Sequence, residues 1–214
     1  MTDFAAENAF YLSATPTRIA KLLAQYEAFK LTVDIPGAIV ECGVFKGASF
    51  CRLALLRELH CNPEAKPLIG FDTFGEYAHG DSPRDEELRA RVVEAAGDRS
   101  IDADELKAVL DRSGCGRNVQ LIAGDITHIM PVFCAQNPEL KISLLNLDVD
   151  FHRAAARVLE FLWPRVSRGG VMLIDDYGTF EGETRAVDEY FRWHGQPLIR
   201  RLPIAYSPCY VVKE

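Results

Sequence analysis

Residues 142–150 read ISLLNLDVD, an apolar run that ends in Asp148 and Asp150. A second apolar run, GVMLIDDY, ends in the same way in Asp175 and Asp176. Such runs are typical of strands that are buried on both faces of a parallel sheet. Neighbouring carboxylates raise each other's pKa, and a hard divalent cation such as Mg²⁺ relieves that penalty. The two stretches therefore indicate consecutive parallel strands with an acidic metal site at their carboxyl ends.

The same pattern extends outward along the chain. Strand-like apolar runs alternate with helical patterns, which favours βαβ units and right-handed crossovers. The last two runs are joined by PIAYSP, a short proline-containing turn that predicts an antiparallel hairpin. We therefore predict a Rossmann-like, doubly wound α/β fold with a seven-stranded, mostly parallel sheet and an antiparallel last strand. The expected strands cover residues 38–42, 67–72, 119–123, 142–148, 170–175, 198–202 and 209–212, and the expected helices cover 15–31, 48–59, 82–96, 102–112, 126–136, 152–163 and 182–194.

Composition narrows the class of protein. The 214 residues are 48% hydrophobic, which suits one α/β domain over residues 1–214. The net charge of −7 argues against a large nucleic-acid surface. No apolar run approaches the about 20 residues that span a bilayer, and MTDFAAENAF does not have the pattern of a secretory signal. The six cysteines show no C-x-x-C spacing, which argues against zinc and fits a reducing compartment. We expect a cytoplasmic protein without a nucleic-acid or membrane partner.

One insertion interrupts the alternation of strands and helices. Residues 75–117 are rich in charge and predict two helices, which is more than a plain crossover needs. An insertion at the carboxyl edge of a sheet is typical of a lid over the substrate, and an oligomer contact is the alternative. We predict a helical cap here and leave both roles open.

Acidic residues and glycines follow the first three expected strands. Glu41 ends the first strand, and Gly43 and Gly47 follow it in ECGVFKG. Asp72 ends the second strand in LIGFDTF, where a carboxylate can accept both hydroxyls of a ribose. Asp125 follows the third strand, where it could meet an adenine edge or cap the next helix. The spacing fits neither G-x-G-x-x-G nor a P-loop, so the pattern indicates a nucleoside cofactor without naming it.

The aspartates after the fourth and fifth strands suit metal-assisted chemistry. Asp148, Asp175 and Asp176 can supply three ligands of an octahedral Mg²⁺ site, while Asp150 can serve as a general base. The alternative for adjacent aspartates at a strand end is helix capping or loop solvation. His152 could assist the base or simply be a polar residue at a helix start.

Five segments together resemble a known family. ECGVFKGAS, IGFDTF, ISLLNLDVD, RGGVMLIDDYG and GETRAVDEYF, in this order, resemble the macrocin-type (macrolide sugar) O-methyltransferases, and the resemblance extends from about Arg18 to the end of the chain. These are class I enzymes that use S-adenosylmethionine and Mg²⁺ to methylate deoxysugar hydroxyls of natural products. The resemblance implies a class I methyltransferase fold, this cofactor, this metal and a homo-oligomer.

The resemblance also implies roles for single residues. Mg²⁺ falls on Asp148, Asp175 and Asp176, with Asp148 also at the reacting centre, and Asp150 is the base. Apart from the resemblance, the position of Tyr177, Arg185 and His152 near the aspartates suggests that they contact the substrate. After Asp72, the segment TFGEYAHGDSPRDEEL departs from the short Glu-Gly-Leu-Pro-like turn of many relatives, so the family's substrate cap cannot be carried over. The expected cofactor-binding residues are Glu41, Gly43, Val44, Phe45, Gly47, Ser49, Asp72, Thr73, Phe74, Gly124, Asp125, Ile126 and Asp148.

We therefore expect Mg²⁺-assisted methyl transfer from S-adenosylmethionine to a hydroxyl of a deoxysugar or similar vicinal diol, carried by a natural product or a nucleotide sugar. One rival is a metal-dependent hydrolase or hydroxylase on the same sheet, which binds no methyl donor. The other is a non-catalytic nucleoside-binding protein, which binds the cofactor but turns over no diol. Fold alone does not separate the three functions.

Overall fold

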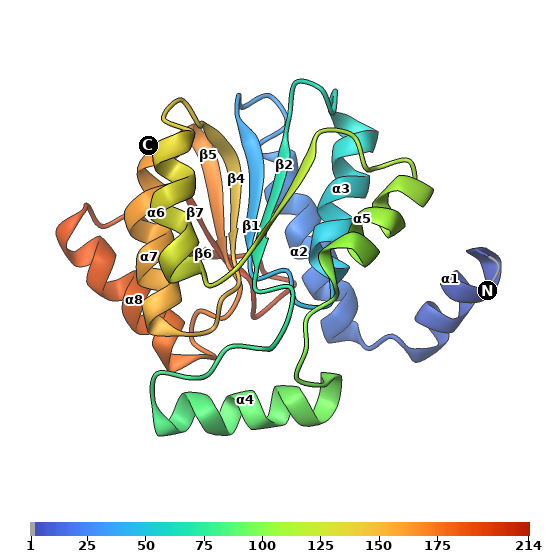
Figure 1. Ribbon diagram of the computed structural model, residues 1–214, viewed down its shortest axis with the longest axis horizontal. Coiled ribbons are helices and arrows are strands. Elements are labelled where there is room, and N and C mark those ends of the chain that lie inside the picture. Colours follow the sequence, from blue (N-terminus) through green and yellow to red (C-terminus); the bar gives the residue numbers. More distant parts are fainter. Residues whose placement is uncertain (1–2) are drawn as a thin grey trace.

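The computed structural model describes residues 3–214 and contains a seven-stranded sheet with helices on both faces (Figure 1). The strand order is β3-β2-β1-β4-β5-β7-β6. The chain runs outward from β1 to β3 and then returns to place β4 on the other side of β1. In open α/β sheets, ligands bind beyond the carboxyl ends of the strands at such a switch point. The strands are β1 (Ala38–Cys42), β2 (Leu68–Asp72), β3 (Val119–Ala123), β4 (Ile142–Leu147), β5 (Val166–Ile174), β6 (Arg200–Arg201) and β7 (Cys209–Val212).

Strand directions confirm the predicted sheet. Every pair from β3 to β5 is parallel, and β7 is antiparallel to both β5 and β6. Two strands differ from their expected limits by more than one residue at an end. β5 begins at Val166 rather than Gly170, because Val166 already pairs with Ile142 of β4 and the register then shifts before Val171 pairs with Leu144. β6 contains only Arg200 and Arg201, which pair with Tyr210 and Cys209 of β7 and are exposed at the sheet edge.

Helices form a layer on each face of the sheet (Figure 1). α2, α3 and α5 bury apolar side chains on one face, and α6, α7 and α8 do so on the other. The sequence did not predict α1, which lies away from the sheet and exposes Phe4 and Leu12. No helix among residues 3–214 is long and apolar enough to cross a membrane. The helices are α1 (Asp3–Ser13), α2 (Pro16–Lys30), α3 (Ala48–His60), α4 (Pro83–Ala96), α5 (Ala103–Arg112), α6 (Ile126–Gln136), α7 (His152–Leu162), the 3₁₀ turn η1 (Trp163–Arg165) and α8 (Glu181–Trp193).

The position of the central strands between two layers of helices explains why their sequences are continuously apolar. Successive residues of a strand point to opposite faces, and here both faces are covered. Val40 and Leu145 pack toward α6 and α7, whereas Ile39 and Leu144 pack toward α2 and α3. Each of these four side chains is fully buried. The sheet therefore holds the ends of β1 and β4 rigidly, and the residues that follow them form the site.

The insertion between β2 and β3 contains two helices with different surroundings. α5 buries Leu106 and Leu110 in the core and acts as the crossover helix. α4 instead lies across the carboxyl edge of the sheet, where its residues line the central cavity (Figure 1). Ser82 caps α4, and the buried Asp85 accepts a hydrogen bond from the N–H of Gly182 at 3.4 Å, which attaches α4 to α8.

Candidate active site

A cavity of about 1040 Å³ opens at the carboxyl ends of the strands. Its walls come from the residues after β1, β2, β3, β4 and β5, and Val92, Ala95 and Ala96 of α4 form one apolar side. A cavity of this size suits a nucleoside cofactor together with a second small molecule. The cavity therefore brings the ends of five strands, far apart in the sequence, to one site.

The loop after β1 approaches the end of β4 very closely. Gly43 has a φ of +91°, and a Cβ placed there would lie 1.7 Å from the carbonyl oxygen of Asp148. Only glycine fits this position, because both the backbone conformation and the contact exclude a side chain. Gly47, with a φ of +82°, begins α3. The glycines expected at a cofactor loop therefore shape the loop and seat it against β4.

Glu41 is a buried carboxylate with one unsatisfied oxygen. Its side chain is wholly buried, and Oε1 accepts hydrogen bonds from the Ser49 hydroxyl and from Asn146 Nδ2. Oε2 is buried without a hydrogen-bond partner. Burial raises the pKa of Glu41 to about 7. Because Ser49 lines the cavity, an ammonium group bound beside Ser49 would provide a positive charge to balance the buried Glu41 carboxylate.

Asp72 and Asp125 hold loops at the cavity wall. Asp72 Oδ2 accepts the backbone N–H groups of Val44 and Phe45, each at 2.9 Å, and its Oδ1 accepts that of Phe74 at 2.8 Å. Asp125 accepts the N–H of Thr127 at 2.8 Å and caps α6. The capping interpretation of Asp125 is thus confirmed. Contacts of the two carboxylates with ribose and adenine stay predictions.

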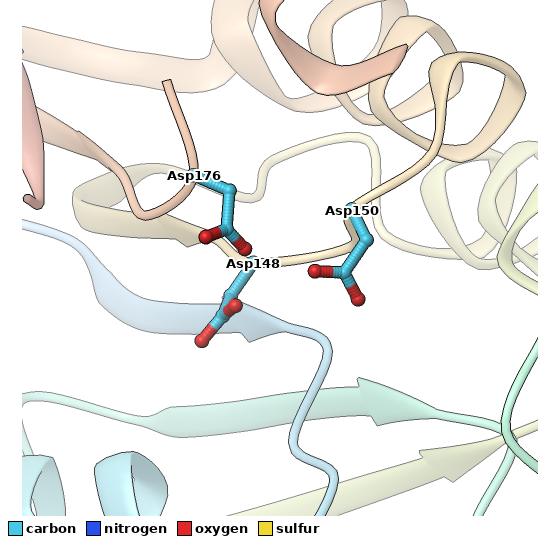
Figure 2. Close-up of side chains that lie close together, drawn as sticks. All are labelled: Asp148, Asp150 and Asp176. Atoms are coloured by element: carbon cyan, nitrogen blue, oxygen red, sulfur yellow. The ribbon is translucent and has the colours of Figure 1, made fainter. Parts of the chain in front are cut away.

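Three aspartates converge beyond β4 and β5 (Figure 2). Asp148, Asp150 and Asp176 each offer a carboxylate oxygen within 4.8 Å of the other two. Asp175, expected among the metal ligands, forms an ion pair with Lys21 through Oδ2 at 2.5 Å. Its Oδ1 is buried and has no hydrogen-bond partner. All four predicted carboxylates line the cavity, but the three at ligand distance include Asp150 rather than the expected Asp175, which has one oxygen in an ion pair and one without a partner.

Burial and mutual repulsion dominate the electrostatics of these carboxylates. Burial and the neighbouring Asp175 raise the pKa of Asp148 well above its usual value, and burial with Asp150 does the same for Asp176. The pKa of Asp150 rises to about 6 because of burial, which hydrogen bonds from Asp176 and Tyr77 oppose. A divalent cation would relieve this repulsion, and carboxylate oxygens are the donors that Mg²⁺ prefers. The residues present therefore fit both S-adenosylmethionine, at Glu41, and Mg²⁺, at the aspartates.

Three residues near the aspartates were not predicted from the sequence. Lys21 reaches them from α2; burial lowers its pKa, but attraction to Asp148 and other aspartates outweighs this and raises it. Tyr77, from the insertion, donates a hydrogen bond to Asp150 Oδ2 at 2.7 Å. Glu183 of α8 is buried and accepts the N–H groups of Val149 and Asp176, which ties the two aspartate loops together. Glu183 lies in GETRAVDEYF, but Lys21 and Tyr77 stand in segments without a motif.

Most of the predicted residues line the cavity, and some do not. Glu41, Gly47 and Phe74 lie behind the wall, in the supports of the loops. The three expected substrate contacts also lie off the cavity, because each is held elsewhere: Tyr177 donates to Asp188 at 2.7 Å, while Arg185 and His152 contact Glu189 at 3.7 and 2.8 Å. Residues on the cavity wall are Gly43, Val44, Phe45, Ser49, Asp72, Thr73, Gly124, Asp125, Ile126, Asp148, Asp150, Asp175 and Asp176.

Comparison with solved structures supports the fold. A crystal structure of CalS11, described as a calicheamicin methyltransferase, superposes with a TM-score of 0.82 at 25% identity, covering 99% of this chain and 86% of that one. The O-methyltransferase NovP gives a TM-score of 0.76 at 18% identity, covering 91% and 80%. The sheet is therefore that of the class I methyltransferases, as predicted.

Sequence comparison places the chain in a family. A tetracenomycin-sugar 4'-O-methyltransferase from Streptomyces olivaceus is 26% identical over 150 residues, which cover 69% of this chain and 55% of the relative. The mycinamicin III 3''-O-methyltransferase of Micromonospora griseorubida is 27% identical over 165 residues, covering 75% and 63%. The chain thus spans less than two thirds of these curated relatives. The family model of the macrocin O-methyltransferases (TylF) matches residues 14–199. The chain therefore belongs to the macrocin O-methyltransferase family.

Proposed function

We propose that this chain transfers a methyl group from S-adenosylmethionine to a hydroxyl of a deoxysugar or similar vicinal diol, with Mg²⁺ at the aspartates. One observation carries the proposal: a single cavity joins the wall beside the unsatisfied Glu41 to the four aspartates. The end of the cavity beside Glu41 suits the amino-acid part of the cofactor. The end at the aspartates suits a metal and an oxygen nucleophile. Family membership supports the same chemistry.

In this proposal, the cofactor lies along the loops after β1, β2 and β3. The ammonium of the methionine part lies at Ser49, and the buried Glu41 behind Ser49 supplies the opposite charge. The glycine loop at Gly43 lets the cofactor approach the backbone, Asp72 lies at the ribose and Asp125 at the adenine. Asp72 is already hydrogen-bonded to two N–H groups of the first loop, so the ribose site and the methionine site are held in one arrangement.

Asp148, Asp175 and Asp176 would hold the metal. The free, buried Oδ1 of Asp175 favours this assignment, since a buried carboxylate oxygen without a partner is costly unless a cation or donor meets it. A bound Mg²⁺ would orient a diol and make its hydroxyl easier to deprotonate. The ion pair with Lys21 engages the other oxygen of Asp175, Oδ2, and leaves Oδ1 available for the metal.

Asp150 would act as the general base. It lines the cavity, and burial raises its pKa to about 6, close to the operating range of a base. S-adenosylmethionine, when bound, would supply the methyl group and keep the electron pair of the broken carbon–sulfur bond on its sulfur, and Asp150 would take the proton that the acceptor hydroxyl loses. Since the sulfonium is already a good leaving group, the protein mainly aligns oxygen, carbon and sulfur.

The acceptor class rests on the names of the relatives, which act on sugars of tetracenomycin and mycinamicin compounds. The substrate is therefore a glycosylated natural product or a nucleotide sugar. We further propose a homo-oligomer, since α1 exposes apolar side chains such as Phe4 and Leu12, and a cytoplasmic location, since the described cysteines are free thiols. Light scattering of the purified chain checks the first of these two statements.

Calorimetric titration of S-adenosylhomocysteine, with and without Mg²⁺, tests the cofactor site. We expect micromolar binding. Mass spectrometry of reactions with nucleotide sugars and glycosides should then detect Mg²⁺-dependent addition of one methyl group. Asp148→Asn should abolish methylation and leave cofactor binding largely intact. Absence of cofactor binding in both buffers would overturn the proposal and favour a hydrolase or hydroxylase.

A further inference from the structure

Tyr77 contacts two parts of the site that lie far apart in the sequence. Its hydroxyl donates a hydrogen bond to Asp150 Oδ2 at 2.7 Å. Its ring packs against Phe45, in the loop after β1, and against Phe151, with ring-centroid distances of 5.2 and 6.1 Å. Tyr77 thus contacts the proposed base and the proposed cofactor loop at once. Methyl transfer depends on the relative position of these two elements.

Contacts from α4 and from the residues after it hold Tyr77 in place. Arg89, in the middle of α4, donates from Nε to the carbonyl of Ala78 at 2.8 Å and from Nη2 to that of Tyr77 at 3.1 Å. The guanidinium also lies 5.6 Å from the centre of the Tyr77 ring. Beyond the C-terminal end of α4, the carbonyl of Asp98 accepts the N–H of Tyr77 at 2.7 Å. These contacts connect the segment that carries Tyr77, and with it the hydrogen bond to Asp150, to α4.

Asp150 has a backbone that needs such support. Its φ is +63°, a left-handed conformation that side-chain-bearing residues rarely adopt. Strained residues of this kind persist where surrounding contacts hold them, often at functional sites. One contact is the N–H of Glu183, which donates to the carbonyl of Asp150 at 3.0 Å. The Tyr77 hydroxyl is a contact on the side chain itself, where it fixes the orientation of the carboxylate.

From this geometry we propose that Tyr77 is a positioning residue, carried by the insertion at α4, that orients the Asp150 carboxylate toward the acceptor and aligns it with the cofactor loop. The inference rests on the proposed role of Asp150 as base. It gives the insertion a part in catalysis.

Tyr77→Phe tests this role, because it keeps the ring packing and removes only the hydroxyl. We expect kcat to fall about tenfold or more, while the KM for the acceptor and the affinity for S-adenosylhomocysteine stay within about threefold. In an Asp150→Asn background, the same substitution should cause no further loss, since the two residues act through one contact. Tyr190→Phe, which removes a hydroxyl on α8 away from the cavity, is the matched control and should retain wild-type kcat.

Hydrogen exchange provides a second readout that needs no turnover. With S-adenosylhomocysteine bound, Tyr77→Phe should speed amide exchange in residues 149–152, and Tyr190→Phe should not. A Tyr77→Phe protein with wild-type kcat, an equal further loss in the Asp150→Asn background, or unchanged exchange would each overturn the positioning role. Failure of the wild-type chain to bind the cofactor would count against the methyltransferase proposal instead, so the two failures are distinguishable.

Discussion

Lys21 of α2 and Asp175 at the end of β5 form an ion pair of 2.5 Å between residues 154 positions apart. The pair occupies one oxygen of Asp175 and leaves the other buried without a partner. The remaining three aspartates lie with carboxylate oxygens within 4.8 Å of one another. Two ligand sets can follow from this arrangement, one that includes Asp175 and one that includes Asp150. The two ligand sets predict that different aspartate variants lose Mg²⁺ binding.

We expect Asp175→Asn to weaken Mg²⁺ binding by at least about tenfold, as Asp148→Asn should, because each removes a ligand oxygen. Asp150→Asn should bind Mg²⁺ within about threefold of wild type but lose about 100-fold or more in kcat, since general-base catalysis contributes about 10²–10⁴-fold. Calorimetric Mg²⁺ titration of each variant, with S-adenosylhomocysteine bound, makes the comparison. The opposite pattern, with Mg²⁺ lost in Asp150→Asn and kept in Asp175→Asn, would assign the third ligand to Asp150.

Lys21→Met should destabilise the chain in the absence of Mg²⁺. Removing one partner of a buried pair costs about 3–5 kcal/mol, and the 32% exposure of the Lys21 side chain reduces this to about 1–2 kcal/mol. For a chain of this size, that loss lowers the Tm by roughly 3–7 °C. Mg²⁺ should restore part of it, because a cation at the aspartates replaces the lost ammonium.

Thermal unfolding with and without Mg²⁺ measures this effect. Lys30→Met is the matched control, since Lys30 pairs with Glu27 at 2.9 Å on the surface of the same helix and exposed pairs contribute little. Its Tm should stay at the wild-type value. A Lys21→Met protein whose Tm is unchanged, or whose loss does not respond to Mg²⁺, would contradict the electrostatic role.

The sequence predicted the sheet because its central strands are buried on both faces, so that residues such as Val40 and Leu145 produce continuous apolar runs. The signal is weaker at β6, which was expected over 198–202 but covers only the two exposed arginines. α1 exposes large apolar side chains such as Phe4 and Leu12 and was not predicted. The acidic strand ends were predicted for a related reason. A carboxylate after a buried strand stands out against its apolar surroundings.

Residues that act through tertiary contacts could not be predicted in this way. Lys21 reads as one polar position of an amphipathic helix, and its partner lies 154 positions away. Tyr77 stands in an irregular segment, 73 positions before Asp150. Tyr177 shows the reverse error, because its place beside the aspartate pair suggested a substrate contact, whereas its hydroxyl binds Asp188 off the cavity. Spacing along the chain identifies strand ends, and the fold decides which side chains meet there.

Cofactor binding should depend on pH through Glu41. The pKa of this buried carboxyl is about 7 in the free protein, and an ammonium beside it favours the ionised form. Binding therefore requires loss of a proton below pH 7, so affinity should fall as the pH falls. The expected loss between pH 8 and pH 6 is about tenfold, following the protonated fraction of the free protein.

Calorimetry with S-adenosylhomocysteine between pH 5.5 and 8, in buffers of different ionisation enthalpy, measures both the affinity and the released proton. Glu41→Gln should bind more weakly and lose the pH dependence in this range, because its amide does not titrate. A wild-type affinity that is constant from pH 6 to pH 8 would remove Glu41 as the partner of the ammonium.

Gly43→Ala should lower the unfolding free energy and the cofactor affinity by more than the backbone strain of a left-handed alanine explains. The φ of +91° is unfavourable for alanine, and the new Cβ would lie 1.7 Å from the Asp148 carbonyl oxygen, so β1 and β4 would have to separate at their ends. Gly114→Ala is the matched control, since Gly114 has a φ of +76° and a Cβ added there would meet no neighbouring atom within 4 Å. The control should cost about 1–2 kcal/mol of unfolding free energy, the strain of a left-handed residue, and keep wild-type cofactor affinity. Gly43→Ala should cost more than the control in urea unfolding and weaken S-adenosylhomocysteine binding at least about tenfold. Equal stability losses with unchanged affinity in both variants would show that the loop after β1 can move away from β4 without disturbing the cofactor site.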